Sequence, residues 1–245
     1  MEITKALINE QSLKAKYQTD IKNFWLNGAF STFQGLGDIR LNFAIFSNPS
    51  HVKNIVIVQG RSESYIKYQE LAYDLYHQGF NVFILDHRGQ GFSERLLDNP
   101  HKGYVKDFDD YATDLNTFIN TYVLPYCSHN AKPYLIAHSM GCAIASLYLI
   151  KHPKTIKAAI FSSPMFAINM GKISPRLATG LIFFSSTLEK LIFKTGHFFP
   201  GQTNHVMKPF SENKLSHSEV RYSIFSELYK SEKSIQLGGV TIQWL

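Results

Sequence analysis

The chain contains only two cysteines among its 245 residues, Cys127 and Cys142. They do not form the closely spaced pairs that bind zinc, and Cys142 falls in a segment with the pattern of a buried helix. A disulfide-stapled fold is therefore disfavoured, and the composition is typical of a reducing compartment. We predict neither a structural disulfide nor a metal site.

Long apolar runs are also absent from the sequence. No stretch approaches the ~18 consecutive apolar residues of a membrane-spanning helix. The N-terminal segment MEITKALINEQSLKAKY lacks the continuous apolar core of a secretory signal. These two absences predict a protein that is made and kept in the cytoplasm.

The net charge is positive but not concentrated in one segment, because the formal net charge of +6 is spread along the chain. Without a long run of like charges or a nucleic-acid-binding motif, the sequence predicts no nucleic-acid partner. Peripheral contact with an anionic membrane, at the inner face of the inner membrane, stays open. Residues 169–194 fit such contact, since an apolar face accompanies Lys172, Arg176, Lys190 and Lys194. Helices that pack on the core with solvated lysines would show the same pattern.

The sequence does contain a regular alternation of strand and helix patterns. Residues 39–46 alternate polar and apolar side chains after the turn-like GLGD, as an antiparallel edge strand does. Continuous apolar runs, typical of strands covered on both faces of a parallel sheet, follow it along the chain. They lie at residues 54–60, 82–89, 133–139 and 156–164. Helical stripes between them lie at residues 68–76, 108–122 and 140–153. The pattern predicts an α/β fold with a doubly wound, mostly parallel sheet.

This alternation stops after Pro164. Residues 165–237 contain helical patches but no convincing strand, and a short apolar stretch, VTIQWL, ends the sequence. We therefore expect two parts, a core at residues 1–164 and a helical cap or lid at residues 165–245. We also expect the last strands of the core to be absent from this chain.

The sequence LIAHSMGCAIA places Ser139 between a strand pattern and a helix pattern. In a nucleophile elbow a strand turns sharply into a helix, and the serine at the bend projects above the sheet. Small residues are needed two positions before and after the serine, and here they are Ala137 and Gly141. Glycine is usual at both, so Ala137 departs from the pattern. An incidental serine on an ordinary turn is the alternative. His138 beside the serine and Gly141 are candidate supporting residues.

A nucleophile elbow needs an oxyanion hole formed by two backbone N–H groups. One would come from Met140, which follows the serine. The other would come from Arg61 in the loop QGRSES, where Gly60 lets the backbone approach the substrate. An ordinary turn at the end of a strand explains this loop equally well.

A further loop, DHRGQGFS, follows the strand expected at 82–89. Its Asp86, His87 and Arg88 are predicted to order the edge of the site. They are not predicted to react, because the catalytic aspartate and histidine of nucleophile-elbow hydrolases come later in the chain.

Three stretches, residues 59–105, residues 135–153 and SSPMF, closely resemble bacterial lysophospholipases of the PldB type. These belong to the monoacylglycerol lipase-like branch of the α/β-hydrolases. The resemblance covers roughly residues 20–245 and includes LSHSEVRY and LGGVTIQW in the expected cap. It implies an α/β-hydrolase fold in which Ser139 is the nucleophile, Met140 and Arg61 are oxyanion donors, and Glu63 orders the loop. It also implies hydrolysis of a fatty-acyl ester of a lysophospholipid or monoglyceride, without a metal or organic cofactor.

The sequence departs from this family in its catalytic acid and base. The family's triad runs Ser, then Asp or Glu, then His in chain order, but this chain has no aspartate after Asp114. The later histidines, none of which has the family's catalytic context, are His152, His197, His205 and His217. We expect impaired activity, because a serine without its base is a poor nucleophile.

Two functions of different classes therefore remain open. The first is a serine-dependent lysophospholipase-like esterase in a shortened form, and the second is a non-catalytic remnant or lipid-binding module. A peptidase or acyltransferase of the same fold is a lesser alternative. Dehalogenases and epoxide hydrolases of this fold are disfavoured, because they carry an aspartate at the nucleophile position.

Overall fold

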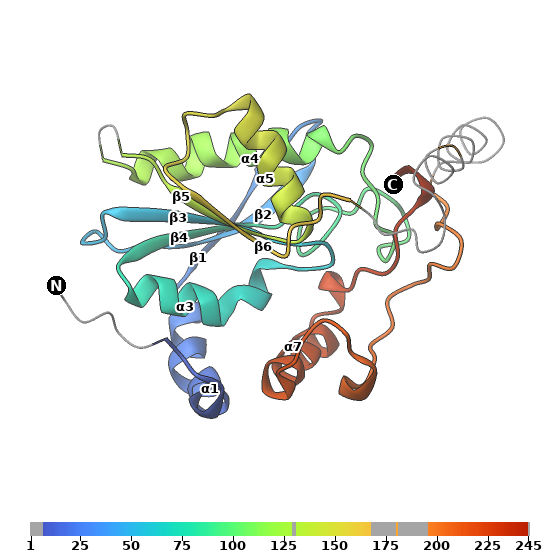
Figure 1. Cartoon of the computed structure of the whole chain (residues 1–245), viewed down its shortest axis with the longest axis horizontal. Coiled ribbons are helices and arrows are strands. Elements are labelled where there is room, and N and C mark those ends of the chain that lie inside the picture. The colour runs from blue at the N-terminus through green and yellow to red at the C-terminus, as the bar shows by residue number, and fades with distance from the viewer. Residues whose placement is uncertain (1–6, 129–130, 168–179, 181–195, 245) are drawn as a thin grey trace.

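The computed structural model describes residues 7–128, 131–167, 180 and 196–244. It is built around a six-stranded mixed sheet with the order β1-β2-β4-β3-β5-β6 (Figure 1). The strands are β1 (Ala29–Gln34), β2 (Arg40–Phe46), β3 (Lys53–Val58), β4 (Phe80–Leu85), β5 (Tyr134–His138) and β6 (Ala159–Ser162). The four strands from β4 to β6 run parallel, and the β1–β2 hairpin joins β4 in antiparallel fashion.

Helices cover both faces of the sheet, which is why its central strands are almost entirely buried. The helix α3 (Gln69–His77) lies on one face, and α4 (Asp109–Phe118) and α5 (Met140–Lys151) lie on the other. Each face has its own apolar cluster, one around Phe83, Leu115 and Ile144 and one around Ile57 and Ala72. The result is the three-layered architecture of an α/β fold.

The predicted parallel strands and the three helices between them are confirmed. The glycine after α3 explains where this helix ends. Gly79 adopts φ +84 just beyond the helix, the left-handed conformation that favours glycine at a helix terminus. The prediction of an edge strand at residues 39–46 was wrong. The strand β2 does form there, but it pairs on its other side with β1, which is the true edge.

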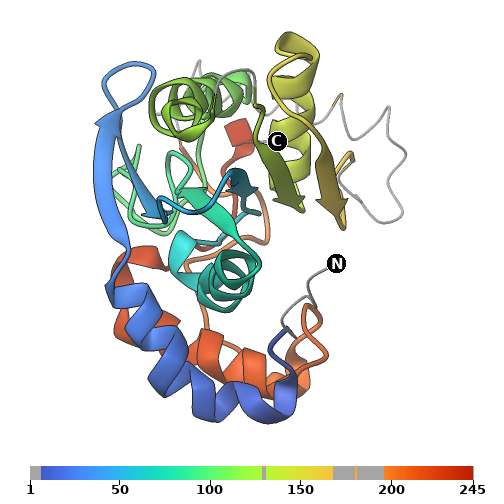
Figure 2. The same cartoon turned by 90° about the vertical axis from the view of Figure 1, so that its left-hand side faces the viewer.

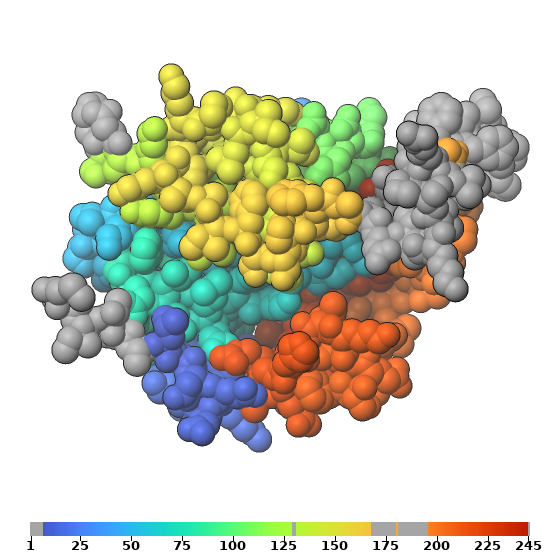
Figure 3. All heavy atoms as spheres, viewed as in Figure 1, coloured from blue at the N-terminus to red at the C-terminus, as the bar shows by residue number. Residues whose placement is uncertain are grey.

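A helix near the N-terminus, α1 (Glu10–Lys16), packs beside α7 (Glu219–Ser231) from the other end of the chain. A single π-helical turn joins α1 to α2 (Lys22–Leu26). The Ser218 hydroxyl at the start of α7 donates to Glu10, and Arg221 forms a bidentate ion pair with Glu70 on α3. Figures 2 and 3 show α7 lying against α1 on the outside of the molecule.

The described residues beyond β6 form irregular chain, the helix α7 and short single-turn helices. In residues 196–244 the β structure consists of isolated bridges, between Gly103 and Val240 and between Phe198 and Thr241. The division into a core and a cap at residue 164 stays a prediction. The basic segment at residues 169–194 lies outside the described residues, apart from residue 180. Among the helices that the structure does describe, none has the length and apolar character needed to cross a bilayer.

A buried ion pair joins the hairpin, α4 and the loop after β4. The Arg88 guanidinium donates two hydrogen bonds to the Asp114 carboxylate, at 2.6 and 2.8 Å, and a further one to Asp110 at 3.0 Å. It also donates to the carbonyl of Leu36 in the hairpin turn, while the Leu36 N–H donates to Asp114. Arg88 and Asp114 are 4% and 1% exposed, so neither charge has water as an alternative partner.

The substitution Arg88→Met is expected to lower the free energy of unfolding by about 3–5 kcal/mol, because it leaves the Asp114 carboxylate buried without its counter-ion. Chemical denaturation monitored by circular dichroism measures this loss. The matched control is Lys151→Met, which removes an ion pair with Asp109 whose side chains are 44% and 52% exposed and should cost less than about 1 kcal/mol. Equal losses in the two variants would contradict the buried-pair argument.

Candidate active site

Ser139 lies where β5 turns into α5, in a backbone conformation that is rare for a residue with a side chain. Its φ and ψ angles are 52° and −119°. Such a conformation costs on the order of 1–3 kcal/mol and persists only when the surrounding structure holds it. The Ser139 N–H donates to the carbonyl of Ser162, and its carbonyl accepts from the N–H groups of Cys142 and Met165. The serine is therefore fixed from both its strand and its helix side.

Close packing of α5 against β3 explains the small residue after the bend. A Cβ atom on Gly141 would lie 2.2 Å from the carbonyl oxygen of Val58, so no larger residue fits without moving the backbone. Ala137, at the other small position, is fully buried. Met140 is buried as the first residue of α5, where a backbone N–H has no carbonyl four residues earlier to bond. This N–H is the predicted first oxyanion donor.

The loop after β3 brings the second predicted donor close to the serine. A Cβ atom added to Gly60 would lie 3.1 Å from the Cβ of Ser139, so the two backbones nearly touch. The Gln90 amide donates to the Gly60 carbonyl at 2.8 Å and to the Glu63 carbonyl at 3.0 Å. Arg61 comes next in the chain, but its side chain turns away to donate to the Gly238 carbonyl at 2.9 Å. Burial lowers the pKa of its guanidinium.

The Glu63 carboxylate holds this loop in place through hydrogen bonds and an ion pair. Its carboxylate accepts from the Gly60 N–H and the Tyr68 hydroxyl, both at 2.6 Å, and pairs with Lys67. It also lies 3.2 Å from Nδ1 of His138, the residue before the candidate nucleophile. Burial alone would raise the pKa of Glu63, but the hydrogen bond and charge of His138, together with Lys67, hold this pKa at about 2. Glu63 is thus a fixed negative charge that ties the loop to β5.

Asp86 links the loop after β3 to the loop after β4. Its fully buried carboxylate accepts from the Gln59 amide, the Ser64 hydroxyl and the backbone N–H groups of Tyr65 and Phe92. Burial raises its pKa to about 6 in spite of these hydrogen bonds.

The two residues that follow Asp86 point into the protein. His87 is 1% exposed, and its Nε2 lies 3.1 Å from the Gln59 carbonyl. Burial lowers the His87 pKa to about 4. Arg88 forms the ion pair with Asp114 described above. Both side chains therefore contact the framework of the loops.

Two of the later histidines, His152 and His205, pack on tyrosine rings. The ring of His152 packs on Tyr148, with centroids 5.0 Å apart, and the ring of His205 packs on Tyr229, at 5.6 Å. None of the hydrogen bonds found among the described residues joins the Ser139 hydroxyl to a histidine or a carboxylate.

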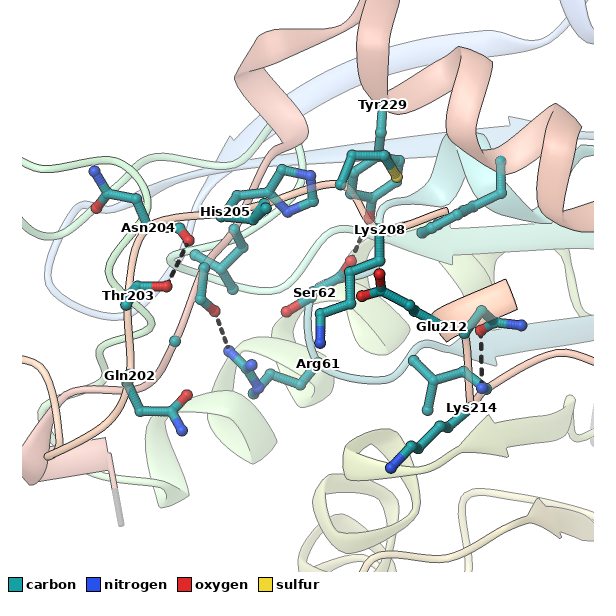
Figure 4. A pocket seen from close by; sticks show the side chains of 18 of the residues that line it. Arg61, Ser62, Gln202, Thr203, Asn204, His205, Lys208, Glu212, Lys214 and Tyr229 are labelled. Carbon is teal, nitrogen blue, oxygen red and sulfur yellow. Dashed lines mark hydrogen bonds between the residues drawn. The ribbon is translucent and has the colours of Figure 1, made fainter. Parts of the chain in front are cut away.

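Sequence reasoning missed a cavity of about 550 Å³ that opens next to the predicted oxyanion loop. Arg61 and Ser62 line one side of it, and residues 201–239 line the other (Figure 4). The hydroxyl of Tyr229 donates to the Ser62 carbonyl, which helps to fix α7 over this loop. The two sides come from distant parts of the chain, so no local motif marks the cavity. Within the described residues, no group of three or more His, Cys, Asp or Glu side chains is placed to hold a metal ion.

Comparison with known proteins agrees with this geometry. The family model described as "Serine aminopeptidase, S33" matches residues 49–245. Lysophospholipase L2 of Escherichia coli K12 is 38% identical over 236 residues, which cover 96% of this chain and 68% of that protein. Monoacylglycerol lipase of Mycolicibacterium smegmatis is 25% identical over 60% of this chain and 50% of its own length. A thermostable carboxyl esterase from Bacillus coagulans shares the fold, with a TM-score of 0.51 at 21% identity over 66% of this chain and 51% of that chain.

Acidification should destabilise the protein partly through His87. Its folded pKa of about 4 lies below the ordinary 6.5, so the unfolded chain takes up the proton first and stability falls as the pH drops from 6.5 to 4. His87→Gln keeps a donor for the Gln59 carbonyl and removes this titration. Denaturation curves across this pH range should therefore show a smaller decrease for the variant than for the natural sequence. Parallel curves for the two proteins would rule out a buried neutral histidine.

Proposed function

Because the chain belongs to the serine aminopeptidase S33 family and is a lysophospholipase- and monoglyceride-lipase-like α/β-hydrolase, we propose that Ser139 hydrolyses fatty-acyl esters of lysophospholipids or monoglycerides. The observation that carries this proposal is the strained backbone of Ser139 at the β5–α5 bend, held against β3 by Gly141. At a strand-to-helix bend such a conformation makes the serine side chain project above the sheet.

The reaction follows from the positions of the neighbouring backbone groups. The Ser139 oxygen would attack the acyl carbonyl carbon and lose its proton to a base, while the carbonyl oxygen becomes an anion. The N–H groups of Met140 and Arg61 would stabilise this oxyanion. Collapse of the intermediate expels the glycerol oxygen, which takes up a proton, and water then releases the fatty acid from the serine.

The relatives support a lipid ester as substrate over a peptide. The 38% identity to Escherichia coli lysophospholipase L2 extends over nearly the whole chain, including residues of the cap. The family description names an aminopeptidase, but fold alone does not determine the substrate. The peptidase and acyltransferase alternatives therefore rank below the esterase.

A second candidate function is lipid binding without chemistry. It is favoured by one observation, that no histidine or carboxylate among the described residues is hydrogen-bonded to the Ser139 hydroxyl. The serine and oxyanion groups would then hold an acyl ester without cleaving it. The same observation sets the expected reactivity of Ser139.

A fluorophosphonate probe should modify Ser139 slowly, because a formed oxyanion hole favours the adduct while no base in the described part of the chain activates the hydroxyl. The adduct is measured by intact mass spectrometry over time, together with fatty-acid release from 1-acyl-lysophosphatidylcholine and 1-acylglycerol. Ser139→Ala should abolish labelling, and Ser163→Ala, at a serine of positive φ directly after β6, should leave it unchanged.

The outcomes separate the two candidate functions. Slow labelling with measurable fatty-acid release supports the esterase, and slow labelling without release supports lipid binding. Rapid stoichiometric labelling would show that a base reaches Ser139, and His205→Ala and His217→Ala would then identify it. Labelling that persists in Ser139→Ala would overturn Ser139 as the nucleophile.

A further inference from the structure

The cavity beside Arg61 has an excess of positive charge. Three cationic side chains line it, those of Arg61, Lys208 and Lys214, against one carboxylate, that of Glu212. Figure 4 shows these side chains around the same hollow. The remaining lining includes apolar and aromatic side chains, among them Phe225. Such a site suits a small anionic group attached to an amphipathic molecule.

Arg61 has no carboxylate partner in the parts of the chain that the structure describes. Its guanidinium donates to the neutral carbonyl of Gly238 and lies over the ring of Trp244, 5.8 Å from the centroid. A Cβ atom on Gly103 would lie 3.2 Å from the same guanidinium, which shows how closely the backbone surrounds it. A guanidinium has five donors in a planar fork that matches a phosphate. Among the described residues one neutral acceptor, the Gly238 carbonyl, is in place for this fork, so donors are left for a ligand.

The cavity also stands in the right place relative to the candidate nucleophile. Gly60, whose backbone nearly touches Ser139, directly precedes Arg61. A second, smaller cavity of about 360 Å³ lies on the Trp244 side and is lined in part by Val105, Phe108 and Met165. Met165 itself donates its N–H to the Ser139 carbonyl. Charged and polar side chains, those of Lys106, Asp107 and Gln243, also line this second cavity.

We propose that the cavity lined by Arg61, Lys208 and Lys214 binds the phosphate of a glycerophospholipid headgroup. This proposal rests on the proposed function for the reaction that follows. It favours lysophospholipids over monoglycerides as substrates, because a monoglyceride carries no negative charge to pair with the three cationic side chains. Binding itself needs no reaction, so it can be tested on an inactive chain.

The test measures binding to the Ser139→Ala protein by saturation-transfer NMR, with sn-glycerol 3-phosphate as the probe and glycerol as its neutral control. Lys208→Gln and Lys214→Gln should each weaken glycerol 3-phosphate binding on the order of tenfold, as expected for loss of a charge-assisted hydrogen bond. Glu212→Gln should tighten it, because a repelling carboxylate is removed. Lys154→Gln, an exposed lysine whose residue does not line the cavity, should leave it unchanged.

Three further measurements make the outcome decisive. Binding should weaken as salt is raised from about 0.05 to 0.5 M, because ions screen the exposed lysines. Inorganic phosphate should bind more weakly than glycerol 3-phosphate, since a headgroup site also contacts the glycerol. Thermal unfolding of each variant shows that the fold is retained.

The proposal is overturned if glycerol 3-phosphate does not bind, or if it binds the two lysine variants as tightly as it binds the Ser139→Ala protein. It is also overturned if inorganic phosphate binds as tightly as glycerol 3-phosphate, which would indicate a site for free phosphate. Failure of the proposed esterase function gives a different result from failure of the headgroup site. A chain that binds glycerol 3-phosphate through Lys208 and Lys214 but never reacts with a fluorophosphonate retains the headgroup site and loses only the chemistry.

Discussion

The geometry of the candidate site depends on the buried carboxylate of Asp86. It accepts hydrogen bonds from the loop after β3 and from its own loop after β4, so one group sets the distance between them. Gly91 passes so close that a Cβ atom there would lie 2.1 Å from Asp86 Oδ2. Since the loop after β3 carries Gly60 and Arg61, Asp86 acts together with Glu63 and Gln90 to fix the position of the predicted oxyanion donor.

Asp86 and Glu63 hold the same loop but respond to pH in opposite directions. Burial raises the Asp86 pKa from 3.8 to about 6, because its hydrogen-bond donors are neutral. Burial also opposes the charge of Glu63, but His138 and Lys67 lower its pKa from 4.5 to about 2. The contribution of Asp86 to stability is therefore lost as the pH rises from 3.8 to 6, and that of Glu63 is lost as it falls from 4.5 to 2. The contributions of Asp86 and Glu63 to folding stability therefore change with pH in opposite directions, each over its own range of pH.

The sequence predicted the central sheet and the serine bend because both leave local signals. Strands covered on both faces must be continuously apolar, and the approach of α5 to β3 requires Gly141. The edge strand β1 was missed because most of its side chains are exposed, so its pattern has no apolar alternation. The Arg61 cavity was missed for a different reason. Arg61 and Gly238 are 177 positions apart, and no local pattern records a contact over that separation.

That long-range contact couples the predicted cap to the site chemistry. The backbone of Arg61 is the predicted oxyanion donor, while its side chain binds the Gly238 carbonyl. The neighbouring backbone is held in turn, because the Gly238 N–H donates to the His101 carbonyl and the Gly103 N–H donates to the Gly239 carbonyl. A shift of this segment would therefore pull on the guanidinium and, through one residue of backbone, on the loop beside Ser139. A ligand that binds the Arg61 guanidinium contacts the same residue whose backbone N–H is the predicted oxyanion donor. Binding in the cationic cavity would therefore affect the position of the oxyanion loop.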